Sequence, residues 1–164
     1  LNIVKKVDEK EKPVPLIDHI GWQLWRQSRS WKSTFETKMI SRGHVWYSES
    51  RGAVVGFLRL HDRQQSLLAA QLDISKQAVQ QLIDELVREG IVERRSDPKD
   101  GRAKLIGLTA HGRKALSDSN DVKQEIEAQY RKILGPKDFG HLTDCLERLS
   151  IAFDSKPENY KPKS

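Results

Sequence analysis

The sequence predicts one mainly helical domain with a small β component, an α+β fold in which a two-stranded hairpin follows a pair of short helices. Three observations support this fold. Apolar residues recur at helical spacing through most of the chain, β-branched residues and turn formers alternate between 91 and 108, and glycine or proline separates the periodic segments. The 164 residues, 37% of them hydrophobic, are enough for one modest core.

Five regions are expected along the chain. Residues 1–15, rich in lysine, glutamate and proline, form an N-terminal arm, and residues 154–164 form a loose tail. Between them, residues 16–48 hold a long N-terminal helix and its connection, residues 49–109 hold the short helices and the hairpin, and residues 110–153 hold C-terminal helices.

Two helices are expected before the pair of short helices. The first extends toward Met39, because its apolar residues recur about every 3.5 positions. These residues are Ile17, Ile20, Leu24, Trp31 and Phe35. The second spans about Glu49–His61 and turns Val54, Phe57 and Leu58 inward, although its glycines have poor helix propensity.

The pair of short helices is predicted between 67 and 89. The second of the pair runs from about Ser75 to Glu89, with Ser75 as N-cap and Gly90 just beyond its end. Its apolar residues fall at i, i+3, i+4 and i+7: Val79, Leu82, Ile83 and Leu86. A shorter helix over 67–72 precedes it, with Asp62 or Ser66 as the expected cap, and the connection is tight. This spacing is typical of a helix-turn-helix.

The exposed face of the 75–89 helix has chemistry that suits DNA. Glutamine offers an amide donor and acceptor together, which fits adenine N7 and N6 in a major groove. The alternative is a solvated polar face without a partner. The outward residues are Lys76, Gln77, Gln80, Gln81 and Asp84.

A charged hairpin follows this helix. Ile91–Arg95 and Lys104–Leu108 are expected as its strands, joined by turn formers between 96 and 101. A tip with Lys99 and Arg102 suits a narrow groove of negative potential, and Asp100 can orient the arginine. The alternative is a plain exposed salt bridge of under about 1 kcal/mol.

Two further helices are expected after the hairpin. Thr109 is a plausible N-cap for the first, which Gly135-Pro136 ends while starting the second. The second has a clean apolar stripe, longer than one small domain needs, and this indicates burial against another subunit. Packing between the first and last helices of one chain is the alternative. The stripe is Phe139, Leu142, Leu146, Leu149 and Phe153.

These features together resemble the MarR family of winged helix-turn-helix transcriptional regulators, over roughly residues 16–153. The resemblance rests on several short motifs in a fixed order. They are Leu68-Ala69, Ser75-Lys76-Gln77-Ala78-Val79, the run from Leu86 to Arg94, Asp97-Pro98-Lys99-Asp100-Gly101-Arg102, and Leu108-Thr109-Ala110-His111-Gly112.

The resemblance implies a homodimer whose terminal helices form the subunit interface. Each subunit would place its second short helix in a major groove of a near-palindromic double-stranded DNA operator and its wing in the adjoining minor groove, with Arg102 as the minor-groove arginine and Asp100 as its orienting partner. The implied DNA-binding residues are Ser66, Ser75, Lys76, Gln77, Gln80, Gln81, Arg94, Arg95, Lys99, Asp100, Arg102 and Lys104.

The resemblance also implies a repressor that a small molecule releases from DNA, with a pocket between the dimerisation helices and the DNA-binding lobe. Aromatic residues interleaved with arginines favour an aromatic carboxylate as the ligand. Core packing is the alternative role for most of them. The candidate ligand-binding residues are Trp22, Trp25, Arg26, Arg29, Trp46 and Phe57.

Composition narrows the remaining functions. The formal charge of +6 favours a polyanionic partner, although basic and acidic residues balance between 73 and 104. No histidine, cysteine or glycine-rich motif with catalytic, metal or phosphate-binding spacing occurs, so no enzyme activity, cofactor or metal is expected. No apolar run is long enough to span a membrane, so a cytoplasmic protein without a membrane partner is expected.

Two alternatives to this function stay open. The same fold can serve as a protein-interaction module that reads no bases. Cys145, the single cysteine, is expected to be a buried structural thiol, but a redox-responsive regulator is the competing interpretation.

Overall fold

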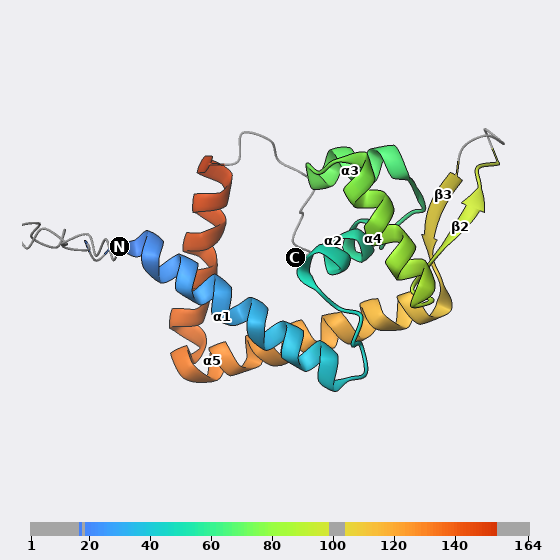
Figure 1. Ribbon diagram of the computed structural model, residues 1–164. Helices are drawn as coiled ribbons and strands as arrows, with labels where there is room; N and C mark the ends of the chain where they lie inside the picture. Colours follow the sequence, from blue (N-terminus) through green and yellow to red (C-terminus); the bar gives the residue numbers. More distant parts are fainter. Residues whose placement is uncertain (1–16, 18, 99–103, 154–164) are drawn as a thin grey trace, which may run out of the picture.

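The computed structural model describes residues 17, 19–98 and 104–153, which form a helical layer and a smaller mixed lobe (Figure 1). The two longest helices cross and make the layer, while three short helices and an antiparallel sheet make the lobe. This confirms the predicted mainly helical α+β class. The elements are α1 (Ile20–Ser41), α2 (Glu49–Phe57), β1 (Arg63–Gln64), α3 (Gln65–Leu72), α4 (Lys76–Arg88), β2 (Val92–Ser96), β3 (Lys104–Leu108) and α5 (Ala110–Phe153).

Helix α5 bends sharply, as Figure 1 shows in its orange and red part. The bend lies at Gly135, whose φ of 77° and ψ of 163° are not helical. Glycine adopts a positive φ without the steric penalty of other residues, and Pro136 then starts the next helical segment with a preset φ. The predicted break at Gly135-Pro136 is therefore confirmed.

The first part of α5 packs on the second half of α1. Phe35 and Met39 from α1 meet Val122 and Ile126 from α5, and all four side chains are buried. The expected extension of the first helix to Met39 is confirmed, and α1 ends two residues later. This contact leaves the beginning of α1 and the end of α5 outside the core.

A polar clasp joins the connection between α1 and α2 to α5. The buried His44 shares a hydrogen bond with Asp118, with Nε2 and Oδ2 2.8 Å apart, and Lys114 Nζ lies 2.7 Å from the same oxygen. The bond from Lys114, and then that from His44, lowers the pKa of the Asp118 carboxyl below its usual range. The hydrogen bond from His44 holds the connection between α1 and α2, which leads into the smaller lobe, against α5.

The core of the smaller lobe gathers side chains from its three helices and from strands β2 and β3. The predicted apolar stripe of α4 is central to it, since Val79, Ile83 and Leu86 are each 0% exposed. They pack with a set from the other elements, namely Trp46, Val54, Val55, Leu58, Leu68, Ala69, Ile91, Val92, Ile106, Leu108 and Ala115. Burial of this stripe fixes the rotation of α4 about its own axis, so that its polar residues face outward.

The sheet has three strands in the order β1-β3-β2, all antiparallel. The pairing of β2 with β3 confirms the predicted hairpin, with Val92 opposite Leu108 and Ser96 opposite Lys104. The third strand, β1, corrects the two-stranded expectation. Its two residues pair with Ile106 and Leu105. A two-residue polar segment has no sequence pattern of its own, because backbone pairing to β3 alone defines it.

Two predicted helix ends are wrong. Helix α2 ends at Phe57 rather than His61, because the chain leaves the helix there to reach β1. Helix α3 begins after Gln64, which makes no side-chain cap, so neither expected residue caps it. The Asp62 carboxylate instead accepts a hydrogen bond from Arg95, and Ser66 lies within the helix.

Two other helix starts are capped as predicted. The Ser75 hydroxyl accepts a hydrogen bond from the backbone N–H of Ala78 at 3.1 Å, and that of Thr109 accepts from Gly112 at 3.0 Å. Between α3 and α4, Asp73 takes a left-handed conformation with φ of 50°, which allows the tight connection. The two helices are therefore joined as a helix-turn-helix.

Candidate nucleic-acid interface

The exposed face of α4 begins at its capped N-terminus. Ser75, Lys76, Gln77 and Gln81 are exposed, and Gln80 is half-buried. They lie opposite the buried stripe of this helix, on the polar face that the sequence predicts. Gln65 donates from Nε2 to the carbonyl oxygen of Lys76 at 3.5 Å, which ties the start of α3 to the start of α4. Free backbone N–H groups and the helix dipole make such an N-terminus suitable for a phosphate.

Gln80 is held by an acidic neighbour one turn along α4. Its Nε2 lies 3.0 Å from both carboxylate oxygens of Asp84. Arg94 of β2 reaches the same group, with its Nη2 2.5 Å from Oδ1. Both hydrogen bonds lower the pKa of the Asp84 carboxyl, and the bond from Gln80 has a larger effect than the bond from Arg94. The three side chains connect the polar face of α4 to the wing.

Gln81 makes a similar contact on the adjacent row of the helix. Its Nε2 donates to Glu85 Oε1 at 3.3 Å. Glu85 in turn pairs with Arg51 of α2, with 3.4 Å between Oε2 and Nε. Both central glutamines of α4 are thus hydrogen-bonded to carboxylates that an arginine from another element also contacts.

Side-chain bonds also fix the outer part of the wing, near the connection between its strands. Arg95 of β2 contacts Asp62 at 3.0 Å and Glu93 on its own strand. Both carboxylates raise the pKa of the Arg95 guanidinium, and the hydrogen bond to Glu93 is the largest cause. Gln64 Nε2 donates to Asp97 at 3.2 Å, and these bonds connect the hairpin to the segment around β1. Across the hairpin, Lys104 Nζ donates to Ser96 Oγ at 3.3 Å.

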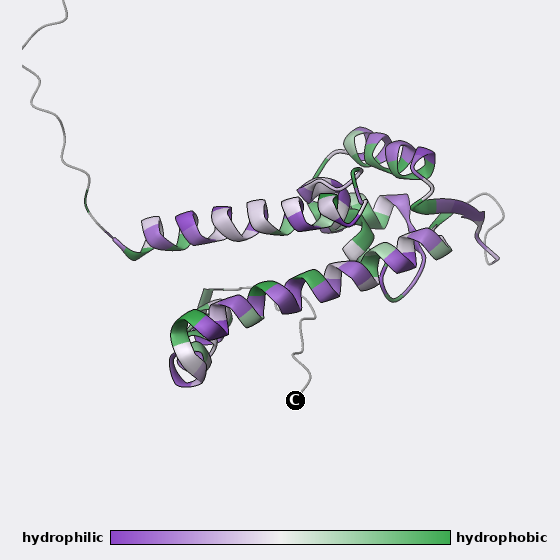
Figure 2. Ribbon diagram, turned by 90° about the horizontal axis from the view of Figure 1, so that it is seen from below, coloured by the Kyte–Doolittle hydropathy of each residue, from purple (hydrophilic) through white to green (hydrophobic). Residues whose placement is uncertain are grey.

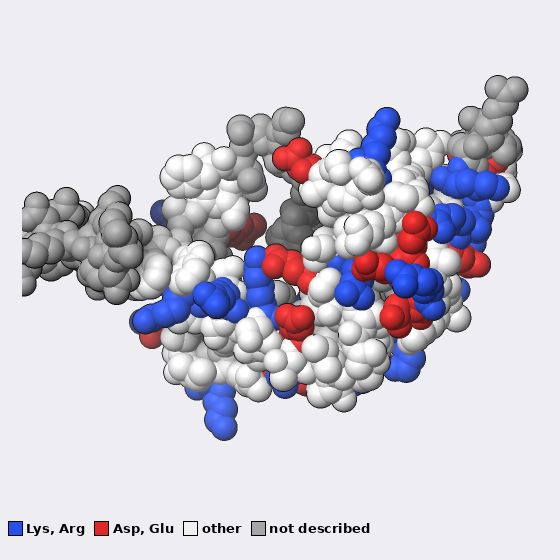
Figure 3. All heavy atoms as spheres, in the orientation of Figure 1, with Lys and Arg blue, Asp and Glu red and all other residues white. Residues whose placement is uncertain are grey.

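Three predicted contact residues, Lys99, Asp100 and Arg102, lie outside the described residues. The others are accounted for: Ser66 is exposed near the start of α3, and Arg94, Arg95 and Lys104 line the wing. Figure 3 shows blue and red side chains intermixed over the part of the molecule where α4 and β2 lie. Among the described residues, charge on this face is therefore organised in pairs rather than as one basic patch.

Sequence reasoning missed the acidic partners in this face. The spacing of Gln80 and Asp84, four residues apart on a helix, could have indicated their contact. No sequence signal indicates that Arg94 meets Asp84 or that Arg95 meets Asp62, because these contacts join different elements. Gly107 allows the second of these contacts, since a Cβ there would collide with the Asp62 carboxylate.

The candidate ligand residues fall into two separate groups. Trp22 and Trp25 stack on the exposed N-terminal half of α1, with ring centroids 4.8 Å apart. Arg29 lies 5.5 Å from the Trp25 ring, and Arg26 is exposed on the same helix. The other two are Trp46, which is buried in the core of the smaller lobe, and Phe57, which packs partly buried against that core.

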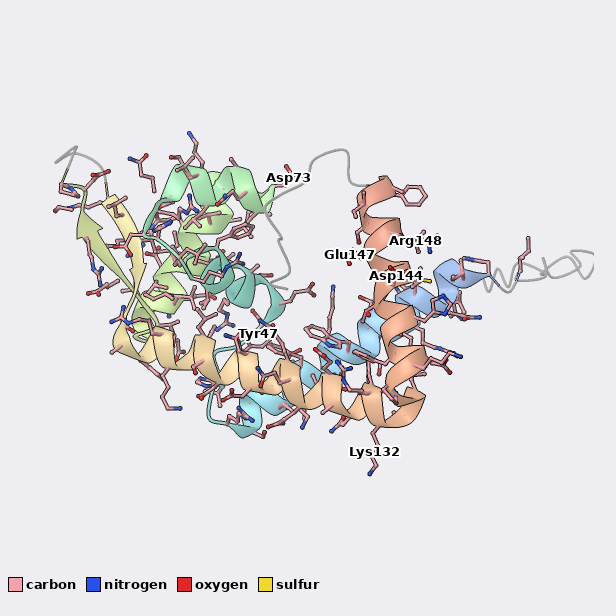
Figure 4. All side chains as sticks on the ribbon, turned by 180° about the vertical axis from the view of Figure 1, so that it is seen from behind. Tyr47, Asp73, Lys132, Asp144, Glu147 and Arg148 are labelled. Carbon is pink, nitrogen blue, oxygen red and sulfur yellow. The ribbon has the colours of Figure 1, made fainter. Side chains whose placement is uncertain are left out.

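A cavity of about 100 Å³ lies between the helical layer and the smaller lobe. Trp46 is the one predicted ligand residue in its lining, and α1, α2 and α5 supply most of the rest. The lining is Trp31, Phe35, Met39, Trp46, Tyr47, Gly52, Val55, Gly56, Ala115, Leu116, Ser119 and Lys123. Figure 4 shows Tyr47 where the chain from α1 to α2 passes α5.

Three lining residues, Trp46, Lys123 and Tyr47, give this cavity polar character. Trp46 is 4% exposed, and its Nε1 has no hydrogen-bond partner among the described residues. Lys123 brings a cation, and burial followed by the charge of Arg59 lowers its pKa. Burial, and then nearby glutamates, raises the pKa of Tyr47. A buried donor and a cation in the lining of one cavity together suit an anion-bearing aromatic molecule.

Apolar side chains are exposed at both ends of the helical layer. Figure 2 shows hydrophobic stretches on the part of α5 beyond its bend. Leu142, Leu146 and Leu149 are about 40% exposed there, and Phe153 far more, while Phe139 is buried under Arg131. Cys145, in the same segment, is half-buried. At the beginning of α1, the exposed apolar residues are Ile20, Trp22, Leu24 and Trp25.

The described residues hold neither a cluster of metal-ligating side chains nor a membrane-spanning helix. No group of three histidine, cysteine or carboxylate side chains in this part of the chain is placed to hold a metal ion. None of its helices combines the length and apolar character that crossing a membrane requires.

Comparisons with known proteins agree with this architecture. Residues 50–103 match the sequence model of the MarR family, whereas no curated protein matches the chain. Among solved structures, MepR, a transcription regulator of the Staphylococcus aureus multidrug efflux pump MepA, has a TM-score of 0.70 at 20% identity, over 84% of this chain and 100% of MepR. A MepR mutant bound to an oligodeoxyribonucleotide has a TM-score of 0.61 at 20% identity, with the same coverage of both chains.

A probable transcriptional regulator from Pseudomonas aeruginosa has a TM-score of 0.62 at 23% identity, over 80% of this chain and 97% of that one. At such identities the likeness to these structures shows the fold alone. The resemblance predicted from the motifs is thus confirmed over residues 50–103, which match the MarR family model, and the chain shares the fold of these transcriptional regulators.

Proposed function

We propose that this chain is a dimeric regulator that binds one double-stranded DNA sequence specifically, with α4 in a major groove and the β2–β3 wing in the adjoining minor groove. The observation that carries the proposal is the division of α4. Val79, Ile83 and Leu86 anchor one side in the core, while the polar side faces outward with Ser75, Lys76, Gln77, Gln80 and Gln81. A rigidly held helix can keep its side chains at base edges. The MepR mutant bound to an oligodeoxyribonucleotide has the same fold, which supports this arrangement.

The contacts divide by chemistry. Ser75 and Lys76, at the N-terminus of α4, bind phosphates, and Gln77, Gln80 and Gln81 bind base edges. Ser66 lies near the start of α3 and contacts the backbone beside them. The wing contributes further basic residues to phosphates, with Arg102 in the minor groove and Asp100 orienting it. Those wing residues are Arg94, Arg95, Lys99 and Lys104.

A homodimer follows from the exposed apolar ends of the helical layer. Leu142, Leu146 and Leu149 recur at helical spacing, and covering them with a second copy would remove them from water. The N-terminal half of α1 offers further apolar surface to the same partner. Two-fold symmetry then demands a near-palindromic operator with half-site centres about one helical turn apart.

A small-molecule effector fits the cavity between the two parts of the fold. The cavity lining comes from both the helical layer and the smaller lobe. A ligand that binds one relative arrangement of these two parts more tightly than another shifts the protein toward that arrangement, and this changes the distance between the two α4 helices of the dimer. An aromatic carboxylate suits the lining, because Trp46 Nε1 and Lys123 can both donate to its oxygens. The proposed outcome is a repressor released from DNA by this ligand.

The effector site predicts a selective loss on removing the Lys123 charge. In the protein with Lys123→Gln, aromatic carboxylates such as salicylate should bind about tenfold more weakly or worse, because a hydrogen bond to a charged group contributes about 1.5–3 kcal/mol. Lys132→Gln is the control, since Figure 4 shows this lysine projecting away from the molecule at the bend of α5. Tryptophan fluorescence during titration reports the binding. Equal affinity of both variants would remove Lys123 from the site.

Salt dependence tests the proposed function against the protein-interaction alternative. A DNA-binding protein should lose affinity steeply as salt rises, because phosphate contacts release counterions. Lys76→Gln should weaken binding to all duplexes alike and lower the salt slope by about 1. Fluorescence anisotropy with a labelled duplex measures both. Affinity that is weak, independent of salt and equal for every duplex would instead favour the interaction module.

A further inference from the structure

The carboxylates of α4 determine which hydrogen-bonding groups its glutamines offer. Gln80 directs its Nε2 at both oxygens of Asp84, each at 3.0 Å. An ionised carboxylate can only accept hydrogen bonds, so the amide nitrogen must face it and the amide oxygen must face away. The orientation of this amide therefore follows from chemistry as well as from the coordinates.

The wing reinforces this orientation. Arg94 Nη2 lies 2.5 Å from Asp84 Oδ1, so a second element holds the carboxylate in place. The two hydrogen-bond donors that converge on Asp84 keep its carboxyl ionised, because they favour the charged form. Gln81, Glu85 and Arg51 repeat the arrangement on the neighbouring row, with a longer amide contact of 3.3 Å.

We infer that Asp84 is a specificity-determining residue, which turns Gln80 into a hydrogen-bond acceptor and thereby selects bases that carry an amino group in the major groove. The inference rests on the proposed function. Adenine offers its N6 amino group and cytosine its N4 amino group, whereas guanine and thymine offer only acceptors at the corresponding edge. With its amide nitrogen turned toward Asp84, Gln80 presents its amide oxygen outward, where it can accept from the amino group of adenine or cytosine and finds no donor on guanine or thymine. Asp84 acts through Gln80, as a positioning residue.

The same contact restrains the attraction of the wing to DNA. Arg94 is paired with Asp84, so its charge is partly neutralised beside the phosphates. Replacing Asp84 with asparagine removes that charge and lets the Gln80 amide turn, because an asparagine amide can also accept or donate. Affinity should rise for every duplex while preference at one base pair of each half-site declines.

The test compares base preference, measured by competition binding against duplexes that carry each of the four base pairs at every half-site position. Unmodified protein should prefer adenine or cytosine about tenfold at the position that Gln80 contacts, the order of one mismatched base pair. Asp84→Asn should reduce that preference to about twofold. Asp84→Glu, which keeps an acceptor four residues from Gln80, should restore it.

Two controls separate positioning from loss of charge or of structure. Glu89→Gln removes an exposed carboxylate from the end of the same helix region, so it should raise affinity without changing base preference. In a Gln80→Ala background, Asp84→Asn should have no remaining effect on preference, because the side chain through which it acts is gone.

The outcomes are distinct. If the unmodified protein prefers no duplex, both the proposed function and this inference are wrong. If it prefers one, but Asp84→Asn retains the full preference, or changes it equally in the Gln80→Ala background, the inference alone is wrong.

Discussion

Replacing Gly112 with alanine is expected to lower the free energy of unfolding by about 1–3 kcal/mol or more, the cost of overpacking a site that cannot relax. A Cβ at this position would collide with the carbonyl oxygen of Ile91 and lie 3.3 Å from Leu108 Cδ2. The carbonyl is backbone, and it also accepts the N–H of Thr109 at 3.1 Å, so it cannot move without breaking that bond. The first turn of α5 would then separate from the base of the wing.

Urea unfolding, followed by circular dichroism, measures this loss. Gly140→Ala is the matched control, because it lies in the same helix and nothing described comes within 4 Å of its added Cβ. Alanine there should preserve stability or raise it by up to about 1 kcal/mol, the difference in helix propensity. Similar unfolding midpoints for Gly112→Ala and the unmodified protein would show that α5 and the wing are not in this close contact.

Introducing a charge into the apolar stripe beyond the bend of α5 should separate the proposed dimer. Leu146 is 41% exposed in the single chain and lies between Leu142 and Leu149 on that stripe. Leu146→Glu would bury an unpaired carboxylate in the interface, which costs about 3 kcal/mol or more. The dissociation constant of the dimer should therefore rise at least about 100-fold.

Sedimentation velocity over a range of protein concentrations measures that change. His141→Glu is the control, since it introduces the same charge into the same helix, five residues away and on the other side at about 100° per residue. It should leave the dimer intact. A monomeric unmodified protein, or equal dissociation of both variants, would contradict the role given to the stripe.

Local signals in the sequence predicted much of the fold. Ser75 and Thr109 cap helices as expected, and Gly135-Pro136 breaks α5, because caps and breaks depend on a few neighbouring residues. The stripe of α4 is buried because its spacing matches the helical repeat. Each of these features has its cause within one or two turns of the chain.

Features that depend on distant residues were not predictable. Strand β1 exists through its pairing with β3, and Asp62 reaches Arg95 rather than capping α3. The candidate DNA-binding residues of α4 were found from their polar character, but their orientation was not, because Asp84 is fixed in part by Arg94 from another element. The ligand candidates were grouped by aromatic content, which cannot separate Trp22 on the surface from Trp46 in the core.

Selection of bound duplexes from a random pool tests the central claim most directly, because it reports sequence preference and symmetry in one measurement. One near-palindromic sequence, whose half-site centres lie about one helical turn apart, should be enriched. A pool that shows no enrichment after several rounds, or that yields a preferred sequence without two-fold symmetry, would contradict sequence-specific DNA binding by a dimer through its two α4 helices.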